Sequence, residues 1–154
     1  MSSHNTLKKF LTLFCFAALT TSAHAAAETY TIDASHTNIG FSVKHLMVSE
    51  TKGAFNDCQG TIQFDPEMPS ALQVDVTIQT KSIDTRNTDR DKHLSGPDFF
   101  DAEKYPTITF KSTSVEKQGN VYMLTGDLTM HGVTKKISIP VAINGPVKSP
   151  FGFQ

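Results

Sequence analysis

The sequence contains no tryptophan, and it has only two cysteines among its 154 residues. Cys15 lies in an apolar N-terminal segment, so Cys58 is the only cysteine in the rest of the chain. A single cysteine cannot form an internal disulfide, which excludes a fold stapled by disulfides. We expect the Cys58 thiol to be buried, with a reactive or intermolecular role as the alternative.

Long apolar runs are also missing. The run from Phe10 to Leu19 is shorter than the roughly 20 residues that a transmembrane helix requires. It follows Lys8 and Lys9 and precedes the small-residue motif Ala23-His24-Ala25, an order that is typical of a secretory signal peptide. We therefore expect residues 1–25 to be cleaved, leaving an exported protein that is not an integral membrane protein.

Neither sign of charge dominates the remaining chain. Without Lys8 and Lys9, the 14 basic residues become 12 against 15 acidic ones, a net charge of about −3. No basic run stands out, which argues against nucleic acid or an anionic membrane surface as the main partner. Removing 25 of the 154 residues leaves 129, a length that predicts one domain over residues 26–154.

Motifs for metal binding and nucleophilic catalysis are absent as well. No H-x-H, H-E-x-x-H or paired Cys/His spacing occurs, and Ser95 lacks the surrounding glycines of a nucleophile elbow. We therefore expect no metal site, no catalytic residue and no enzyme activity. The histidines that remain after cleavage are His36, His45, His93 and His131.

The chain does contain repeated period-two alternation of apolar and polar residues, which predicts strands. The most regular example alternates Leu72, Val74, Val76 and Ile78 with polar residues. Glycines 53 and 60 interrupt an earlier run and suggest bulges or sharp bends. About seven strands are expected, and the clearest lie near 39–45, 72–78, 107–114, 121–130 and 135–144.

Residues 87–105 interrupt this pattern with a short helical insert. Thr88 and Asp91 have the spacing of a capping box, and Gly96 is placed to end the helix in a left-handed conformation. Tyr105-Pro106 then closes the insert, because the residue before proline is pushed out of helical space.

One helical insert cannot cover a one-faced sheet, so the sheet must fold over on itself. Hairpin-length connections favour an all-β, lipocalin-like, antiparallel up-and-down barrel, whose interior at about eight strands holds side chains or one small ligand. A count of seven strands, with Pro146 to Gln154 starting a strand that does not arrive, predicts a barrel incomplete at the C-terminus and a truncated chain.

Three segments carry a resemblance to a known family: IDASHTNIGFSVKHL, NTDRDKHLSGPDFFDAEKYPTITF and GDLTMHGVTKKISIPV. In this order and spacing they resemble the signature segments of the YceI-like, polyisoprenoid-binding proteins. The resemblance implies a periplasmic barrel that binds a long isoprenoid or similar lipid, with no cofactor beyond that lipid and no established chemistry. Family members continue for further strands, which again questions barrel closure here.

Two groups of candidate site residues follow. Arg90 and its neighbours on the insert suit a polar head group, because arginine and a helix N-terminus both favour phosphate; the alternative is a structural role that anchors the insert. The head-group candidates are Asn87, Arg90, Asp91 and His93. The candidates for lining the cavity are Phe41, Val43, His45, Phe64, Val74, Val76, Ile78, Leu94, Phe99, Phe100, Phe110 and Leu128.

The sequence thus predicts a protein that carries or stores a long-chain isoprenoid or similar amphiphile in the periplasm. Two alternatives from other classes stay open: an enzyme acting on a lipid-like or quinone substrate, and an interaction module with a solid core. Whether the protein forms a homodimer is also open.

Overall fold

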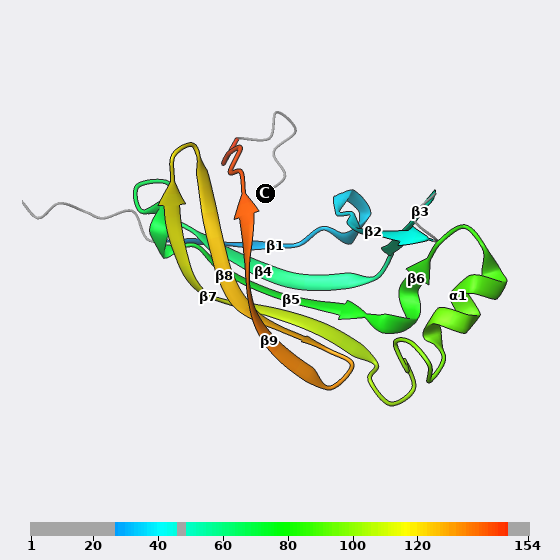
Figure 1. Ribbon diagram of the computed structural model, residues 1–154. Helices are drawn as coiled ribbons and strands as arrows, with labels where there is room; N and C mark the ends of the chain where they lie inside the picture. Colours follow the sequence, from blue (N-terminus) through cyan, green and yellow to red (C-terminus); the bar gives the residue numbers. More distant parts are fainter. Residues whose placement is uncertain (1–26, 46–48, 148–154) are drawn as a thin grey trace, which may run out of the picture.

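The computed structural model describes residues 27–45 and 49–147, which form two antiparallel sheets with one α-helix at one end (Figure 1). Within these ranges the larger sheet has six strands in the order β1-β4-β5-β7-β8-β9, and the smaller has the order β2-β3-β6. The larger sheet comprises β1 (Glu28–Thr31), β4 (Cys58–Phe64), β5 (Gln73–Gln79), β7 (Thr107–Gln118), β8 (Val121–Met130) and β9 (Val133–Val141). The other elements are β2 (Ile39–His45), β3 (Ser49–Phe55), β6 (Ile83–Asp84), α1 (Thr88–Ser95) and the 3₁₀ turns η1 (Ala34–His36), η2 (Pro69–Ala71) and η3 (Thr80–Ser82).

The alternation in β5 sets the two faces of the larger sheet. Val74, Val76 and Ile78 share one face, where they meet buried residues of the neighbouring strands. We call this the inner face, and the face that carries Asp75 and Thr77 the outer face. Directly paired residues of antiparallel strands lie on the same face, so the register assigns every strand of this sheet.

The chain passes between the two sheets four times, and two of these crossings are short corners that lie together. β3 and β4 are joined by Asn56-Asp57, and β5 and β6 by η3. The corners bind each other, because the Asn56 N–H donates to the Ser82 carbonyl at 3.0 Å and the Gln79 N–H donates to the Asp57 carbonyl at 2.9 Å. The chain therefore folds over on itself at one end, as expected.

The barrel is not closed. Among the described residues, β9 pairs only with β8 and β1 only with β4, so the larger sheet has two edges. The predicted all-β class, antiparallel pairing and incomplete barrel are confirmed. The expected signal peptide and the final residues 148–154 lie outside the described residues, and the domain bounds stay a prediction.

Two details of the predicted strands were wrong. The described ranges hold nine strands rather than about seven, because the Asn56-Asp57 corner divides one expected run and η3 leads into the short β6. Gly53 and Gly60 are not bulges but in-register residues, opposite Phe41 and Val76. The irregularity of pairing lies instead between Ser112 and Ser114 in β7.

The helical insert is present, but its caps differ from the prediction. The N-cap is Asn87, whose side chain accepts a hydrogen bond from the Arg90 N–H at 2.9 Å. Asp91 is consequently free to bind elsewhere. Gly96 ends the helix with an extended φ of −76°, whereas the left-handed residue after α1 is Asp101, with φ of 46°.

The end of the insert attaches to the corner of the sheets. The backbone N–H of Thr80 donates to the Pro106 carbonyl at 2.9 Å, and its hydroxyl donates to the Tyr105 carbonyl at 2.8 Å. Thr80 is 1% exposed. The Tyr105 ring packs edge-on against His131 at 4.6 Å between centroids, at the turn between β8 and β9. The insert therefore bridges the corner and the β8–β9 hairpin.

We predict that Gly60→Ala destabilises the fold, whereas Gly40→Ala does not. A Cβ on Gly60 would collide with the backbone carbonyl of Asp75 on the paired strand, which cannot move aside alone. At Gly40 the nearest atoms lie 3.4 Å or more from that position. Overpacking of this kind costs about 1–3 kcal/mol, which thermal and urea unfolding of both variants would measure. Equal stability of the two variants would contradict this account.

Candidate ligand-binding face

The inner face carries two clusters of apolar side chains. The first is built on Phe55, Cys58, Ile78, Ile83 and Ile108, and the second on Phe64, Leu72, Phe110, Val115 and Leu124. Leu128 packs against both clusters, so the apolar surface is continuous from one to the other. The Cys58 thiol is buried in the first cluster, as expected.

Most of the predicted cavity-lining residues meet in these clusters. The first cluster includes Phe41, Val76, Ile78, Leu94 and Phe100. The second includes Phe64, Val74 and Phe110, and Leu128 belongs to both. The structure therefore packs these nine residues together, from the inner face, from β2 and from the insert, while their role in lining a ligand cavity stays a prediction.

Three of the predicted lining residues are not in the clusters. Val43 lies on β2 opposite Thr51 and is 56% exposed. Phe99 is 47% exposed, and its ring packs edge-on against His93 at 4.9 Å. His45 ends β2, but its side chain lies outside the described residues.

The insert contacts the inner face through aromatic rings. Phe100 packs edge-on against Phe55 at 5.5 Å between centroids, and Phe55 contacts Phe41 at 5.8 Å. Edge-to-face pairs at these distances are favourable beyond the area that they bury. Leu94 joins the same cluster from α1. The insert thus covers the end of the inner face that lies beside β2, β3 and β6 (Figure 1).

The head-group candidates on α1 are engaged with one buried residue that the sequence did not point out. Thr85, 4% exposed, donates its backbone N–H and its hydroxyl to Asp91 Oδ1 at 2.8 and 2.6 Å. Arg90 donates from Nε to the Thr85 hydroxyl and from its terminal nitrogen to the Thr85 carbonyl, both at 2.7 Å. These contacts anchor the helix to the strand before it, the structural alternative considered for this pair.

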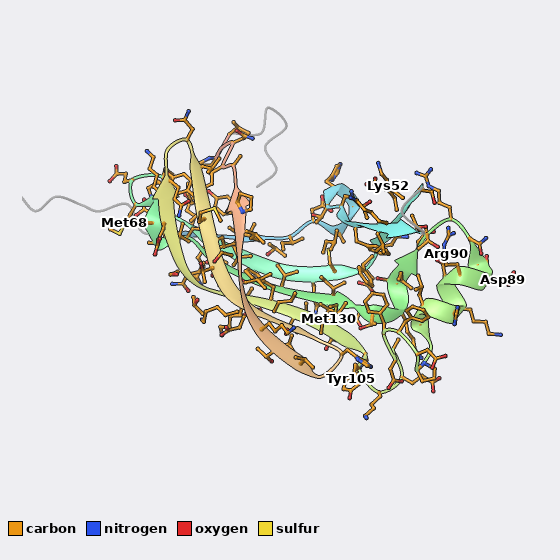
Figure 2. All side chains as sticks on the ribbon, in the orientation of Figure 1. Lys52, Met68, Asp89, Arg90, Tyr105 and Met130 are labelled. Atoms are coloured by element: carbon orange, nitrogen blue, oxygen red, sulfur yellow. The ribbon has the colours of Figure 1, made fainter. Side chains whose placement is uncertain are left out.

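The remaining two head-group candidates also have partners within the insert. Asn87 uses its side-chain oxygen as the N-cap of α1, and the His93 ring contacts Phe99. Arg90 lies near the end of the molecule that is opposite Met68 (Figure 2). Nothing here tests binding of a head group, so that role stays a prediction for all four residues.

A polar cluster at η1, formed by Asp33, Ser35 and His36, has no motif in the sequence that would predict it. The Ser35 hydroxyl donates to Asp33 Oδ1 at 2.6 Å, and His36 Nδ1 lies 2.7 Å from Asp33 Oδ2 and 3.0 Å from the Ser35 hydroxyl. Hydrogen bonds from the Ser35 hydroxyl, from His36 and from the Ser35 backbone lower the pKa of Asp33 to about 2. A catalytic triad would place serine and carboxylate on opposite ring nitrogens. Here both contact Nδ1, so the arrangement is that of a capped turn.

A hollow of about 650 Å³ opens beside the smaller sheet. Its lining includes Asn38, Ser42 and Asn56 with the charged residues Lys52, Asp84 and Arg86. The backbone N–H of Arg86 and the amide of Asn56 lower the pKa of the Asp84 carboxyl. The hollow is therefore mainly polar, and Phe41 is the one member of its lining that also packs against the first cluster.

Further observations concern metals and membranes. In residues 27–45 and 49–147, no three histidine, cysteine or acidic side chains converge as a metal site would require. The helical segments of the same ranges include none with the length and apolarity needed to cross a bilayer.

Part of the inner face is apolar and yet exposed. On β8 and β9, Met130 is 40% exposed, Val133 is 55% exposed and Ile139 is 39% exposed. The register pairs Met130 with Val133, and Ile139 with the buried Leu124. These side chains therefore extend the inner face past the clusters, toward the open edge at β9.

We predict that Thr85→Val destabilises the protein while Thr88→Val leaves it nearly unchanged. Valine keeps the methyl group but removes the hydroxyl, so Arg90 Nε loses its acceptor and Asp91 loses one donor. Leaving such groups unpaired costs about 1–3 kcal/mol. Thr88 is exposed at the start of α1 and serves as the control. Chemical denaturation would measure the difference; two equally stable variants would show that the Thr85 contacts anchor nothing.

Comparison with known proteins places these features in a family. The YceI-like domain matches residues 30–154. Protein YceI of Escherichia coli O6:H1 is 44% identical over 149 residues, covering 95% of this chain and 78% of the relative. The crystal structure of Burkholderia cenocepacia BcnA is similar, with a TM-score of 0.71 and 29% identity, and the match covers 75% of this chain and 73% of BcnA. The crystal structure of a Campylobacter jejuni YCEI protein is also similar, with a TM-score of 0.63 and 44% identity, and the match covers 80% of this chain and 72% of that one. The chain belongs to the YceI-like family.

Proposed function

We propose that this protein binds a long-chain isoprenoid or a similar amphiphilic lipid along the inner face of its larger sheet. The supporting observation is the exposure of Met130, Val133 and Ile139 on the face that carries the two buried apolar clusters. Exposed apolar surface that continues a hydrophobic cluster is favourable only when something covers it. A flexible apolar chain lying across β8 and β9 would do so.

The energetics permit such binding. Burial contributes roughly 0.8 kcal/mol per methylene, so a five-carbon isoprene unit contributes on the order of 4 kcal/mol before ordering costs. Micromolar affinity corresponds to about 8 kcal/mol. A few isoprene units therefore suffice even after the entropy of ordering the chain is subtracted.

We further propose that the lipid is carried or stored in the periplasm after residues 1–25 have been cleaved. The support is the order of basic residues, apolar run and Ala23-His24-Ala25 in the sequence. Membership of the YceI-like family is consistent with binding rather than catalysis. Binding alone accounts for the geometry, since the polar clusters at η1 and α1 act as caps and anchors.

A solid core is the second candidate, and it also has an observation in its favour. Ile108 and Leu124 are 4% and 2% exposed, so parts of the inner face are already filled by side chains. If the whole face were filled, the protein would be an interaction module without an apolar ligand. The two candidates differ in what happens when a side chain is enlarged.

The first test is direct. Full-length protein purified from its own host is expected to release a lipid with a long apolar tail when native mass spectrometry is combined with organic extraction. A denatured aliquot and an unrelated periplasmic protein, processed in parallel, control for carry-over. Protein that is ligand-free in every preparation, and that binds no added isoprenoid, would refute the proposal; conversion of an added lipid or quinone would favour an enzyme.

The second test enlarges the inner face. Val76→Phe and Leu128→Phe are expected to melt near the wild type and to lose co-purified lipid, because the added volume occupies the ligand's place. Thr77→Phe, one residue along β5 on the outer face, should keep the lipid. In a solid core, the two inner substitutions would instead cost about 1–3 kcal/mol by overpacking. Early melting of both, with no lipid in the parent, would support the interaction module.

A further inference from the structure

Two inner-face positions of the larger sheet carry lysines, Lys117 on β7 and Lys135 on β9, and Lys135 is the one beside the exposed apolar residues of β9. Lys135 on β9 pairs directly with Leu128 on β8, which pairs with Phe110 on β7, which pairs with Val76 on β5. Directly paired residues share a face. Lys135 therefore lies on the same face as the two apolar clusters, at the edge end of an otherwise apolar row.

The neighbouring lysine shows the ordinary arrangement. Lys136 faces the outer side, where its Nζ lies 3.2 Å from Asp127. Lys111 on the same outer face lies 3.7 Å from Asp75. Lys135 takes part in no ion pair among residues 27–45 and 49–147, and its neighbours on the inner face are apolar.

The other inner-face lysine, Lys117, lies at the far end of the same strands and contacts an aromatic ring. Lys117 pairs with Tyr122 at the β7–β8 turn, and its Nζ lies 5.9 Å from the centre of the Tyr122 ring. From Lys135 to Val141, the residue opposite Tyr122 on β9, six residues span roughly 20 Å of extended strand. The side chains between them on this face are Ile137 and Ile139. The inner face of β9 thus presents a charge followed by an apolar track.

We propose that Lys135 selects amphiphiles with an anionic head group, a phosphate or a carboxylate, and that the tail runs along β9 toward Val141. This inference rests on the proposed lipid binding and adds the charge of the ligand. The lysine stem contributes apolar contact while its ammonium meets the head group. In this proposal the head group lies at Lys135 on β9 and not at Arg90, because Nε and one terminal nitrogen of Arg90 are already bound to Thr85.

The test uses three probes that share one tail: geranylgeraniol, geranylgeranoic acid and geranylgeranyl phosphate, each below its micellar concentration. Dissociation constants would be measured for the full chain by displacement of a neutral fluorescent probe. The wild type is expected to bind the two acidic probes about tenfold more tightly than the alcohol, as charge-assisted hydrogen bonds allow. The preference should shrink as salt is added.

Three variants locate the effect. Lys135→Met should bind all three probes equally, with the affinity for the alcohol unchanged, because only the charge interaction is lost. Lys136→Met, the adjacent lysine on the outer face, should keep the wild-type preference. Lys135→Arg should keep it as well, which separates charge from any effect of the substitution on folding. If the acid and the phosphate both bind more tightly than the alcohol by a similar factor, Lys135 selects negative charge alone. If only one of them binds more tightly than the alcohol, Lys135 selects that head group.

The experiment distinguishes a failure of the role of Lys135 from a failure of lipid binding. If the wild type binds the three probes equally, or if Lys135→Met keeps the preference, the role of Lys135 is refuted while lipid binding stands. If the wild type binds none of them, lipid binding fails and the role of Lys135 fails with it.

Discussion

The pairing of β7 with both β5 and β8 is the constraint on which the rest of the structure depends. This register aligns Val76, Phe110 and Leu128 in one row and so defines a single apolar face across three strands. A slip of one residue would turn every apolar side chain to the other side. The corners and the insert cover one end of this face, whereas it stays exposed at the edge strand β9.

The inner face of the larger sheet is covered at one end and exposed at β9. At one end, Phe100 and Leu94 of the insert pack onto the first cluster, held in place by the contacts of Arg90 and Asp91 with Thr85. At β9, the same face is exposed. The anchored insert therefore covers one end of the face, while β8 and β9 leave apolar side chains exposed at the other side.

Much of this was predictable because strand alternation is a local property. Period-two runs identified most of the strands, and the signature segments identified the family. Burial is not a local property: Val43 and Phe99 fit the sequence pattern of a lining residue, yet they are 56% and 47% exposed and lie outside the two clusters, so their role in lining a cavity stays a prediction. Gly60 was predicted as a bend, but its real constraint is the neighbouring backbone at Asp75.

The sequence by itself determined the all-β class, the position of the insert and the set of apolar residues, because these depend on spacing along the chain. Only the tertiary structure decided which polar residues are engaged with one another. Thr85 becomes the partner of Arg90 and Asp91 because the chain turns between β6 and α1. Lys135 and Lys136 are adjacent in sequence and alike in chemistry, and the register with β8 alone places one beside Leu128 and the other beside Asp127.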